Sequence, residues 1–107
     1  MASRLTASVD QIRQLGEARK VLFTLKALRE IANLELGLDP DDVCDVLAGL
    51  QRSDLAERIQ SQVTGEWMYI FKPSLEGVVV YVKVILRDDC LVVSFHEDEE
   101  ADVEEAR

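Results

Sequence analysis

The spacing of apolar residues along the chain changes past its middle. In the first part, apolar side chains recur every three or four residues, which is the period of a helix with one buried face. In the later part, short runs rich in valine and aromatic residues are bounded by turn residues, as in β-strands. This order predicts an α+β domain in which N-terminal helices pack on a C-terminal sheet.

Four helices are expected in the first part, with turn and capping residues at their ends. They are expected at residues 9–17, 25–36, 40–48 and 53–60, with Ser8 capping the first and Gly37 ending the second. Asp39-Pro40 is the clearest start, because the aspartate accepts backbone N–H groups and proline suits the first helical position. Asp39, Asp41 and Asp42 together could also suggest a metal site, but capping and the helix dipole account for them.

Three strands are expected in the later part. They are expected at residues 67–71, 78–87 and 90–96, joined by a turn at 73–77 and a tight loop at Asp88-Asp89. The apolar stretch at residues 20–24 fits either a short strand or a helix. The expected fold is therefore a three-stranded antiparallel sheet with the N-terminal helices on one face.

The last hairpin predicts a face that carries reactive side chains. If Asp88-Asp89 is a two-residue loop, directly opposite residues share a face, and so do residues two apart. The opposite pairs are then Arg87 and Cys90, Tyr81 and His96, and Lys83 and Ser94. The other face is apolar and is expected to be core: Val78, Val80, Val82, Val84, Leu86, Leu91, Val93 and Phe95.

The side chains on the first face suit the cleavage of RNA without a metal or other cofactor. A 2′-hydroxyl must lose a proton to attack the adjacent phosphate, and the leaving 5′-oxygen must gain one. His96 could serve as the acid or the base, because an imidazole side chain can both accept and donate a proton near neutral pH. Lys83 and Arg87 could stabilise the phosphate charge, and Tyr81 could hydrogen-bond the phosphate or stack on a base. A solvated sheet face would show the same residues, and a one-residue slip would separate them.

Charge is concentrated at the end of the chain. The net charge is −9, and residues 97–107 contribute −6 of it, which leaves −3 for residues 1–96. We therefore expect one domain at residues 1–96 and a disordered acidic tail at residues 97–107. The alternative is a tail that mimics RNA and screens a basic site.

Composition excludes several classes of protein. No apolar run is long enough to cross a membrane, and the first residues lack the apolar stretch of a signal peptide. Cys44, Cys90 and His96 do not have the spacing of a zinc site, so two buried thiols in a reducing compartment are expected. The expected location is the cytoplasm.

Several motifs from Glu35 onward resemble the MqsR toxin family, the motility quorum-sensing regulator type. The matching stretches are Glu35-Leu36-Gly37-Leu38-Asp39, Val43-Cys44-Asp45-Val46-Leu47-Ala48-Gly49-Leu50, Ser53-Asp54, Trp67, Lys72-Pro73, Gly77, Val80-Tyr81-Val82-Lys83-Val84 and Leu91-Val92-Val93-Ser94-Phe95. With a weaker match before Glu35, the similarity covers roughly residues 9–97.

The resemblance implies a RelE-like fold and an endoribonuclease that cuts single-stranded mRNA as the toxin of a type II toxin–antitoxin pair. It also implies inhibition by an antitoxin, commonly a zinc-containing protein with a helix-turn-helix DNA-binding domain, so DNA is contacted only through that partner. Tyr81 matches the family's active-site tyrosine, and His96 stands where the family often has lysine. We expect His96, Tyr81 and Lys83 to be catalytic, and Arg58, Lys72 and Arg87 to bind RNA.

Two departures from the family pattern support a second hypothesis. Met68 replaces the glutamine that usually follows the tryptophan, and Glu57 replaces a functional lysine, for which Arg58 substitutes if its helix rotates slightly. With the net charge of −9, these changes also fit a catalytically weakened, toxin-like module that binds an antitoxin or regulator. An unrelated structural α+β domain is the third reading.

Overall fold

A computed structural model describes residues 4–99, without the side chains of Arg4 and Leu5. Three α-helices and six strands follow the predicted order of helices first and sheet afterwards, so the α+β class is confirmed. The helices are α1 (Arg4–Glu17), α2 (Leu25–Asn33) and α3 (Pro40–Ala48), and a 3-10 turn, η1, spans Arg52–Asp54. The strands are β1 (Val21–Phe23), β2 (Leu55–Gln60), β3 (Trp67–Phe71), β4 (Ser74–Leu75), β5 (Val78–Leu86) and β6 (Cys90–Glu97).

The sheet is larger than predicted and is mixed. Its order is β1-β6-β5-β3-β2, with β4 paired to β5, and β1 runs parallel to β6 while the other pairs are antiparallel. The prediction of a three-stranded antiparallel sheet was therefore wrong. The meander β3-β5-β6 is present, and two strands that precede it in the chain, β1 and β2, extend it at its two edges.

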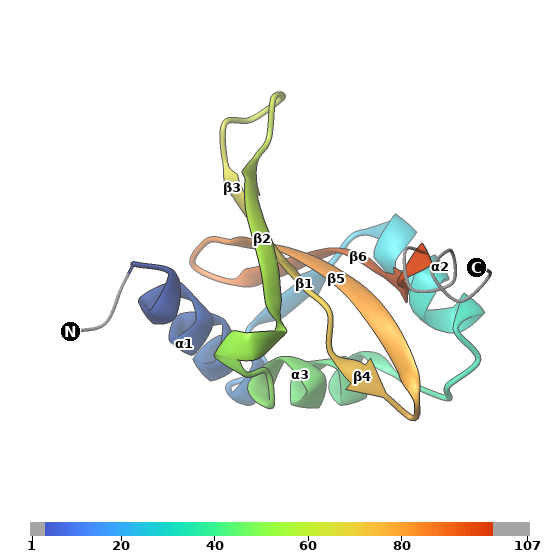
Figure 1. Ribbon diagram of the computed structural model, residues 1–107. Helices are drawn as coiled ribbons and strands as arrows, with labels where there is room; N and C mark the ends of the chain where they lie inside the picture. The colour runs from blue at the N-terminus through green and yellow to red at the C-terminus, as the bar shows by residue number, and fades with distance from the viewer. Residues whose placement is uncertain (1–3, 100–107) are drawn as a thin grey trace, which may run out of the picture.

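Helices α1 and α3 lie side by side beneath one face of the sheet (Figure 1). The core lies between these two helices and the sheet. Ile12 and Leu47 of the helices belong to one buried cluster with Phe71, Val82 and Phe95 of the sheet, and all five are fully buried. Gly16 permits the close approach of the two helices. A Cβ at this position would lie 2.8 Å from the carbonyl oxygen of Cys44.

The start of α3 is the one predicted. The Asp42 N–H donates to Asp39 Oδ1 at 2.8 Å, and the Asp39 N–H donates to Asp42 Oδ2 at 3.0 Å, which completes a capping box. Asp41 pairs with Arg19, whose Nε lies 2.8 Å from its carboxylate. All three aspartates thus have structural roles.

The first two helices have different bounds from those predicted. Helix α1 begins at Arg4, so Ser8 lies inside it and not at its cap; its buried hydroxyl lies 3.1 Å from the Tyr69 hydroxyl, within hydrogen-bonding distance. Helix α2 ends at Asn33 instead of residue 36, and Glu35 and Gly37 have positive φ angles of 56° and 70°.

The expected helix at residues 53–60 is wrong. Only Arg52–Asp54 form a helical turn, and Leu55–Gln60 form strand β2, which pairs with β3 through a β-bulge between Leu55 and Glu57. The four-residue spacing of Leu55 and Ile59 looks helical, but pairing with β3 decides the structure. Neighbouring residues of a strand point to opposite faces, so Arg58 cannot replace Glu57 by a small rotation.

The β5–β6 register agrees with the prediction only at the far end of the hairpin. Tyr81 pairs with His96 and Lys83 with Ser94, as predicted. Near the turn, Leu86 and not Arg87 lies opposite Cys90, because the loop has three residues. A β-bulge between Lys83 and Val84 on the β5 side restores the register, and the extra residue on β6 is Val93.

The bulge also changes which residues of β6 reach the core. Val92, which is fully buried, takes the place predicted for Leu91 and Val93, both only partly buried. The prediction for those two residues was wrong, since it assumed unbroken alternation. Phe95 and the buried valines of β5 (Val80, Val82 and Val84) are in the core as predicted.

The expected tail lies mostly outside the described residues. Residues 100–107 belong to that part of the chain, whereas Glu97 completes β6 and Asp98 is only 6% exposed. None of the helices within residues 4–99 combines the length and apolar character needed to cross a membrane.

Candidate active site

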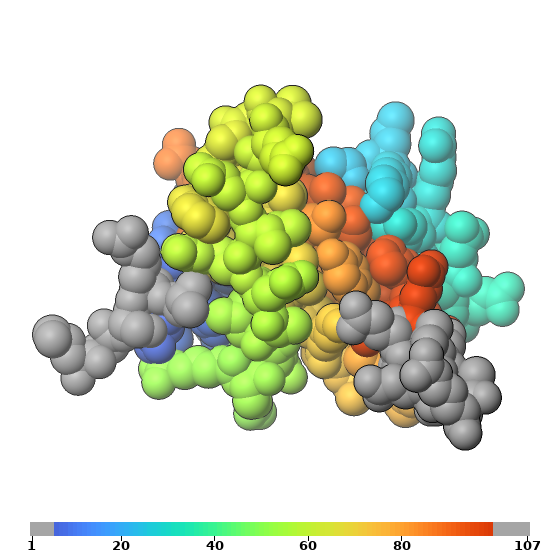
Figure 2. Space-filling view, turned by 45° about the horizontal axis from the view of Figure 1, so that its top comes forward, coloured from blue at the N-terminus to red at the C-terminus, as the bar shows by residue number. Residues whose placement is uncertain are grey.

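The sheet face opposite α1 and α3 carries the predicted polar residues. On this face β5 contributes Tyr81 and Lys83, and β6 contributes Ser94 and His96. Figure 2 shows the orange and red atoms of β5 and β6 as a floor between two higher walls. One wall is the green-to-yellow β2–β3 hairpin, and the other is the blue-to-cyan α2.

Tyr81 and His96 form a stacked pair on this floor. Their ring centroids are 4.9 Å apart and their planes differ by 11°. Both side chains are half-buried. The ammonium of Lys83 lies 5.9 Å from the centre of the Tyr81 ring, within the range of a cation–π contact. The three residues predicted to be catalytic therefore lie together.

The backbone selects the tautomer of His96. Its Nδ1 lies 2.8 Å from the carbonyl oxygen of Glu97, and a carbonyl oxygen can only accept a hydrogen bond. Nδ1 must therefore carry the proton. In the neutral ring Nε2 then holds the lone pair and is the atom able to accept a proton from a ligand.

Helix α2 adds a cation that sequence reasoning missed. Lys26 donates from Nζ to the buried Ser94 hydroxyl at 2.8 Å and lies 3.1 Å from Glu30 Oε2. Glu30 Oε1 in turn accepts the Phe95 N–H at 3.0 Å. The sequence shows only a Lys–Glu pair four residues apart on a helix. Strand β1 holds α2 against β6. Thr24, which lies between β1 and α2, donates its N–H to the carbonyl of Val92 in β6 at 3.1 Å.

Lys72 lies on the same sheet face, directly after the end of β3. Phe71 pairs with Val82, so continuing that register by one residue places Lys72 opposite Tyr81. Its Nζ lies 3.5 Å from Asp98 Oδ2, and the Asp98 N–H donates to Val79 at 2.8 Å. Asp98 was not among the predicted site residues, because it was assigned to the tail.

The structure does not bring Arg58 and Arg87 to this group. Arg58 pairs with Tyr69 on the core side of the sheet, and its guanidinium lies 4.0 Å from the Trp67 ring centre. Arg87 donates from Nε and Nη2 to Glu66 at 2.7 and 2.6 Å. These hydrogen bonds hold the pKa of Glu66 below, and that of Arg87 above, its ordinary value.

The two departures from the family pattern also lie on the polar face. Met68 is opposite Ile85, and Glu57 is opposite Ile70. Ile70 and Ile85 are both buried but lie outside the main core. Along β2 and β3 this wall of the groove is therefore apolar, with one carboxylate, and the cation opposite Tyr81 is Lys72, just past the end of β3.

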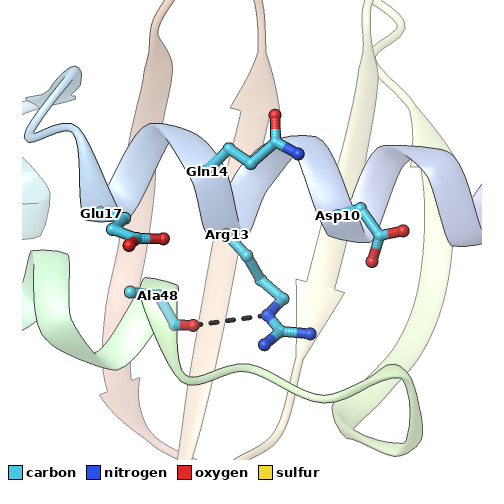
Figure 3. A pocket seen from close by; sticks show the side chains of 5 residues that line it. All are labelled: Asp10, Arg13, Gln14, Glu17 and Ala48. Carbon is cyan, nitrogen blue, oxygen red and sulfur yellow. Dashed lines mark hydrogen bonds between the residues drawn. The ribbon is translucent and has the colours of Figure 1, made fainter.

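Other depressions carry less chemistry. Figure 3 shows one along α1 that is lined by Asp10, Arg13, Gln14, Glu17 and Ala48, and in it Arg13 Nε donates to the carbonyl of Ala48 at 3.3 Å. It lies on the helical side of the molecule, away from the Tyr81 face. A larger one, between the end of α3, η1 and β4, encloses about 460 Å³ and has Lys72 on its rim.

The geometry of the polar face suits proton transfer beside an anion. An imidazole with a defined tautomer lies next to a phenol, and lysines approach from β5, α2 and the end of β3. Amino groups around an acid–base side chain can neutralise charge that develops on a phosphate.

Comparison with known proteins gives two results that agree with each other. A family model described as "Motility quorum-sensing regulator, toxin of MqsA" matches residues 4–97. The mRNA interferase toxin MqsR of Escherichia coli (strain K12) is 34% identical over 90 residues, which cover 83% of this chain and 90% of that protein.

Proposed function

Because the chain belongs to the MqsR toxin family, we propose that it is a toxin that cleaves mRNA as an endoribonuclease and is neutralised by a cognate antitoxin. The observation that carries the assignment to this face is the stacked Tyr81–His96 pair, with Lys83 beside it and Lys26 across the groove. The surface of β5 and β6 between the β2–β3 hairpin and α2 forms a groove (Figure 2), which suits an extended single strand of RNA.

The proposed reaction is attack of a 2′-hydroxyl on its own 3′-phosphate. The O–P bond to the next nucleotide breaks, which leaves a 2′,3′-cyclic phosphate and a free 5′-hydroxyl. Nε2 of His96 accepts the proton that the 2′-hydroxyl loses, since Nδ1 is engaged by Glu97. A water molecule donates a proton to the leaving 5′-oxygen, and the imidazolium returns its proton to the solvent. Lys83 and Lys26 stabilise the charge on the phosphate, and the Tyr81 hydroxyl hydrogen-bonds it. None of these roles needs a metal ion or cofactor.

The test is cleavage of a defined single-stranded RNA in EDTA by the purified protein. We expect His96→Ala to lower the rate by about 10²-fold or more, as for loss of a general acid or base, and Tyr81→Phe to lower it less. Gln14→Ala, an exposed amide of the depression in Figure 3, is the matched control and should cut normally. Equal cutting by His96→Ala and wild type would place the chemistry elsewhere.

The second candidate is a toxin-like module that binds an antitoxin or regulator without efficient cleavage. Met68 and Glu57 on the groove wall favour it, and so does the net charge of −9. Expression in bacteria separates the two functions. Growth arrest that His96→Ala relieves supports the nuclease, whereas harmless expression with retained antitoxin binding supports the module.

The partner is proposed from the family description, which names a toxin of MqsA. We expect a zinc-containing antitoxin with a helix-turn-helix DNA-binding domain, so that DNA is reached only through it. Co-purification with the product of a neighbouring gene, followed by zinc analysis of the complex, tests this expectation. Cleavage of mRNA also places the proposed activity in the cytoplasm.

A further inference from the structure

We propose that a pocket beside His96 binds one base of the RNA and selects bases that carry an exocyclic amino group. This inference rests on the proposed ribonuclease function and names a base-recognition site within the same groove. The pocket encloses about 210 Å³ and is lined by Glu30, Asn33, Leu34, His96 and Glu97. This volume is below the roughly 300–1,000 Å³ of sites for drug-sized ligands, which suits one planar ring system.

The pocket lies on the side of His96 that Tyr81 does not occupy. Strand β6 has β5, which carries Tyr81, on one side, and β1 with the adjoining α2 on the other. Glu30, Asn33 and Leu34 come from α2 and the residue that caps its end. A base in the pocket therefore extends the Tyr81–His96 stack by one ring, as unpaired RNA bases do on aromatic side chains.

Glu30 accounts for the proposed preference for bases that carry an exocyclic amino group. Its carboxylate is fixed by the Phe95 N–H at 3.0 Å and by Lys26 Nζ at 3.1 Å, and its side chain is 20% exposed. An ionised carboxylate has about four acceptor positions and no donor. The positions left over can accept an N–H of adenine, cytosine or guanine, whose exocyclic amino groups are donors. The corresponding group of uracil is a carbonyl, which the carboxylate repels.

Asn33 supplies hydrogen bonds that do not depend on one base. It is the last residue of α2 and is exposed, and its side chain makes no hydrogen bond within residues 4–99. Its amide offers both donors and an acceptor to the edge of a base. Leu34 packs partly against the core and gives the pocket an apolar side.

Binding of non-cleavable RNA tests the pocket separately from catalysis. The probes are 2′-fluoro pentamers of uracil nucleotides with one central base, either adenine or unsubstituted purine, which differ only in the amino group. We expect the wild type to bind the adenine probe about tenfold more tightly, the value of one charged hydrogen bond. Glu30→Gln should reduce this ratio to about threefold or less, because its oxygen is occupied by the Phe95 N–H.

Asn33→Ala provides a second variant that breaks no hydrogen bond within the described chain. It should weaken binding of both probes and leave their ratio unchanged, whereas the control Gln14→Ala should leave both affinities unchanged. Equal binding of the two probes by the wild type, or a ratio that Glu30→Gln does not alter, overturns the proposal. If the protein discriminates between the two probes but cleaves no RNA, the proposed nuclease activity is refuted and the base-binding pocket stands. If it cleaves RNA but binds the two probes equally, the pocket is refuted and the nuclease activity stands.

Discussion

His96 is constrained from two directions, and this is what makes a single histidine useful here. The Tyr81 ring fixes its plane, and the Glu97 carbonyl fixes its tautomer. A side chain that keeps one orientation loses little entropy when a substrate binds, so Nε2 can meet a reacting oxygen without searching. Orientation of His96 does not stabilise the charge on the phosphate, so that part of the rate enhancement must come from the cations around the Tyr81–His96 pair.

Lys26 is the cation whose removal tests that view. Lys26→Ala should lower kcat/KM for RNA by about tenfold, the effect expected for one charged contact to phosphate in a partly desolvated groove. Lys20→Ala is the matched control, since Lys20 is exposed outside the groove-forming strands and helices. A loss of the same size in both variants would mean that Lys26 acts only through overall charge.

Elements built from neighbouring residues are the ones that the sequence predicts well. The Asp39-Pro40 helix start and the strand at Trp67–Phe71 agree with their predictions, because capping and alternation are local. Strand β1 and the helical wall of the groove depend on contacts between residues about seventy positions apart, such as Val21 with Cys90. No local pattern encodes such contacts.

The candidate site shows the same division. Tyr81 and His96 could be paired from the sequence because they lie on one hairpin, although the assumed loop was one residue too short and the bulge at Val93 compensated for it. Lys26 and Glu30 could not be placed, since they reach the site only through the packing of α2 on β6.

The capping box of α3 allows a stability test at the scale of one element. Asp39→Ala should lower the free energy of unfolding by about 1 kcal/mol, because the Asp42 N–H loses its side-chain acceptor while the Asp39 N–H keeps the Asp42 carboxylate. Chemical denaturation measures the change, with the exposed loop residue Asp88→Ala as control. Equal stability of the two variants would show that α3 does not depend on its cap.

The Glu66–Arg87 pair joins the start of β3 to the end of β5 and has a defined pH dependence. The folded state lowers the pKa of Glu66 from 4.5, mainly through the hydrogen bonds from Arg87. The stabilisation is therefore complete above the unfolded pKa and is lost as pH falls through the folded pKa. Thermal unfolding of wild type and Glu66→Gln should differ at neutral pH and converge in acid, and a difference independent of pH would contradict this assignment.

In the whole molecule the two faces of the sheet have different roles. One face packs on α1 and α3 and holds the core, and the other is left open between the β2–β3 hairpin and α2 (Figures 1 and 2). Net charge is −9, so attraction of RNA depends on where the lysines lie and not on the total.

That arrangement predicts a weak dependence of RNA binding on salt. With Lys26, Lys72 and Lys83 contacting phosphates, the slope of log affinity against log salt concentration should be about −2 for single-stranded RNA. Lys83→Ala should reduce the slope by about 0.7, whereas Arg58→Ala, on the other side of the sheet, should not change it. A slope that responds equally to both variants would place the RNA on a different surface.

The pairing of β1 with β6 also determines when, during translation of this protein, the candidate site can be complete. Val21 lies opposite Cys90, so the strand that anchors α2 waits for nearly all of the described chain to be made. A nascent chain that has reached only β5 contains Tyr81 and Lys83 but neither His96 nor the partner strand of β1. Contacts between such distant positions form late. The histidine of the candidate site and the anchored helical wall are therefore both missing until translation of the domain is almost complete, so the proposed cleavage cannot begin on a shorter nascent chain.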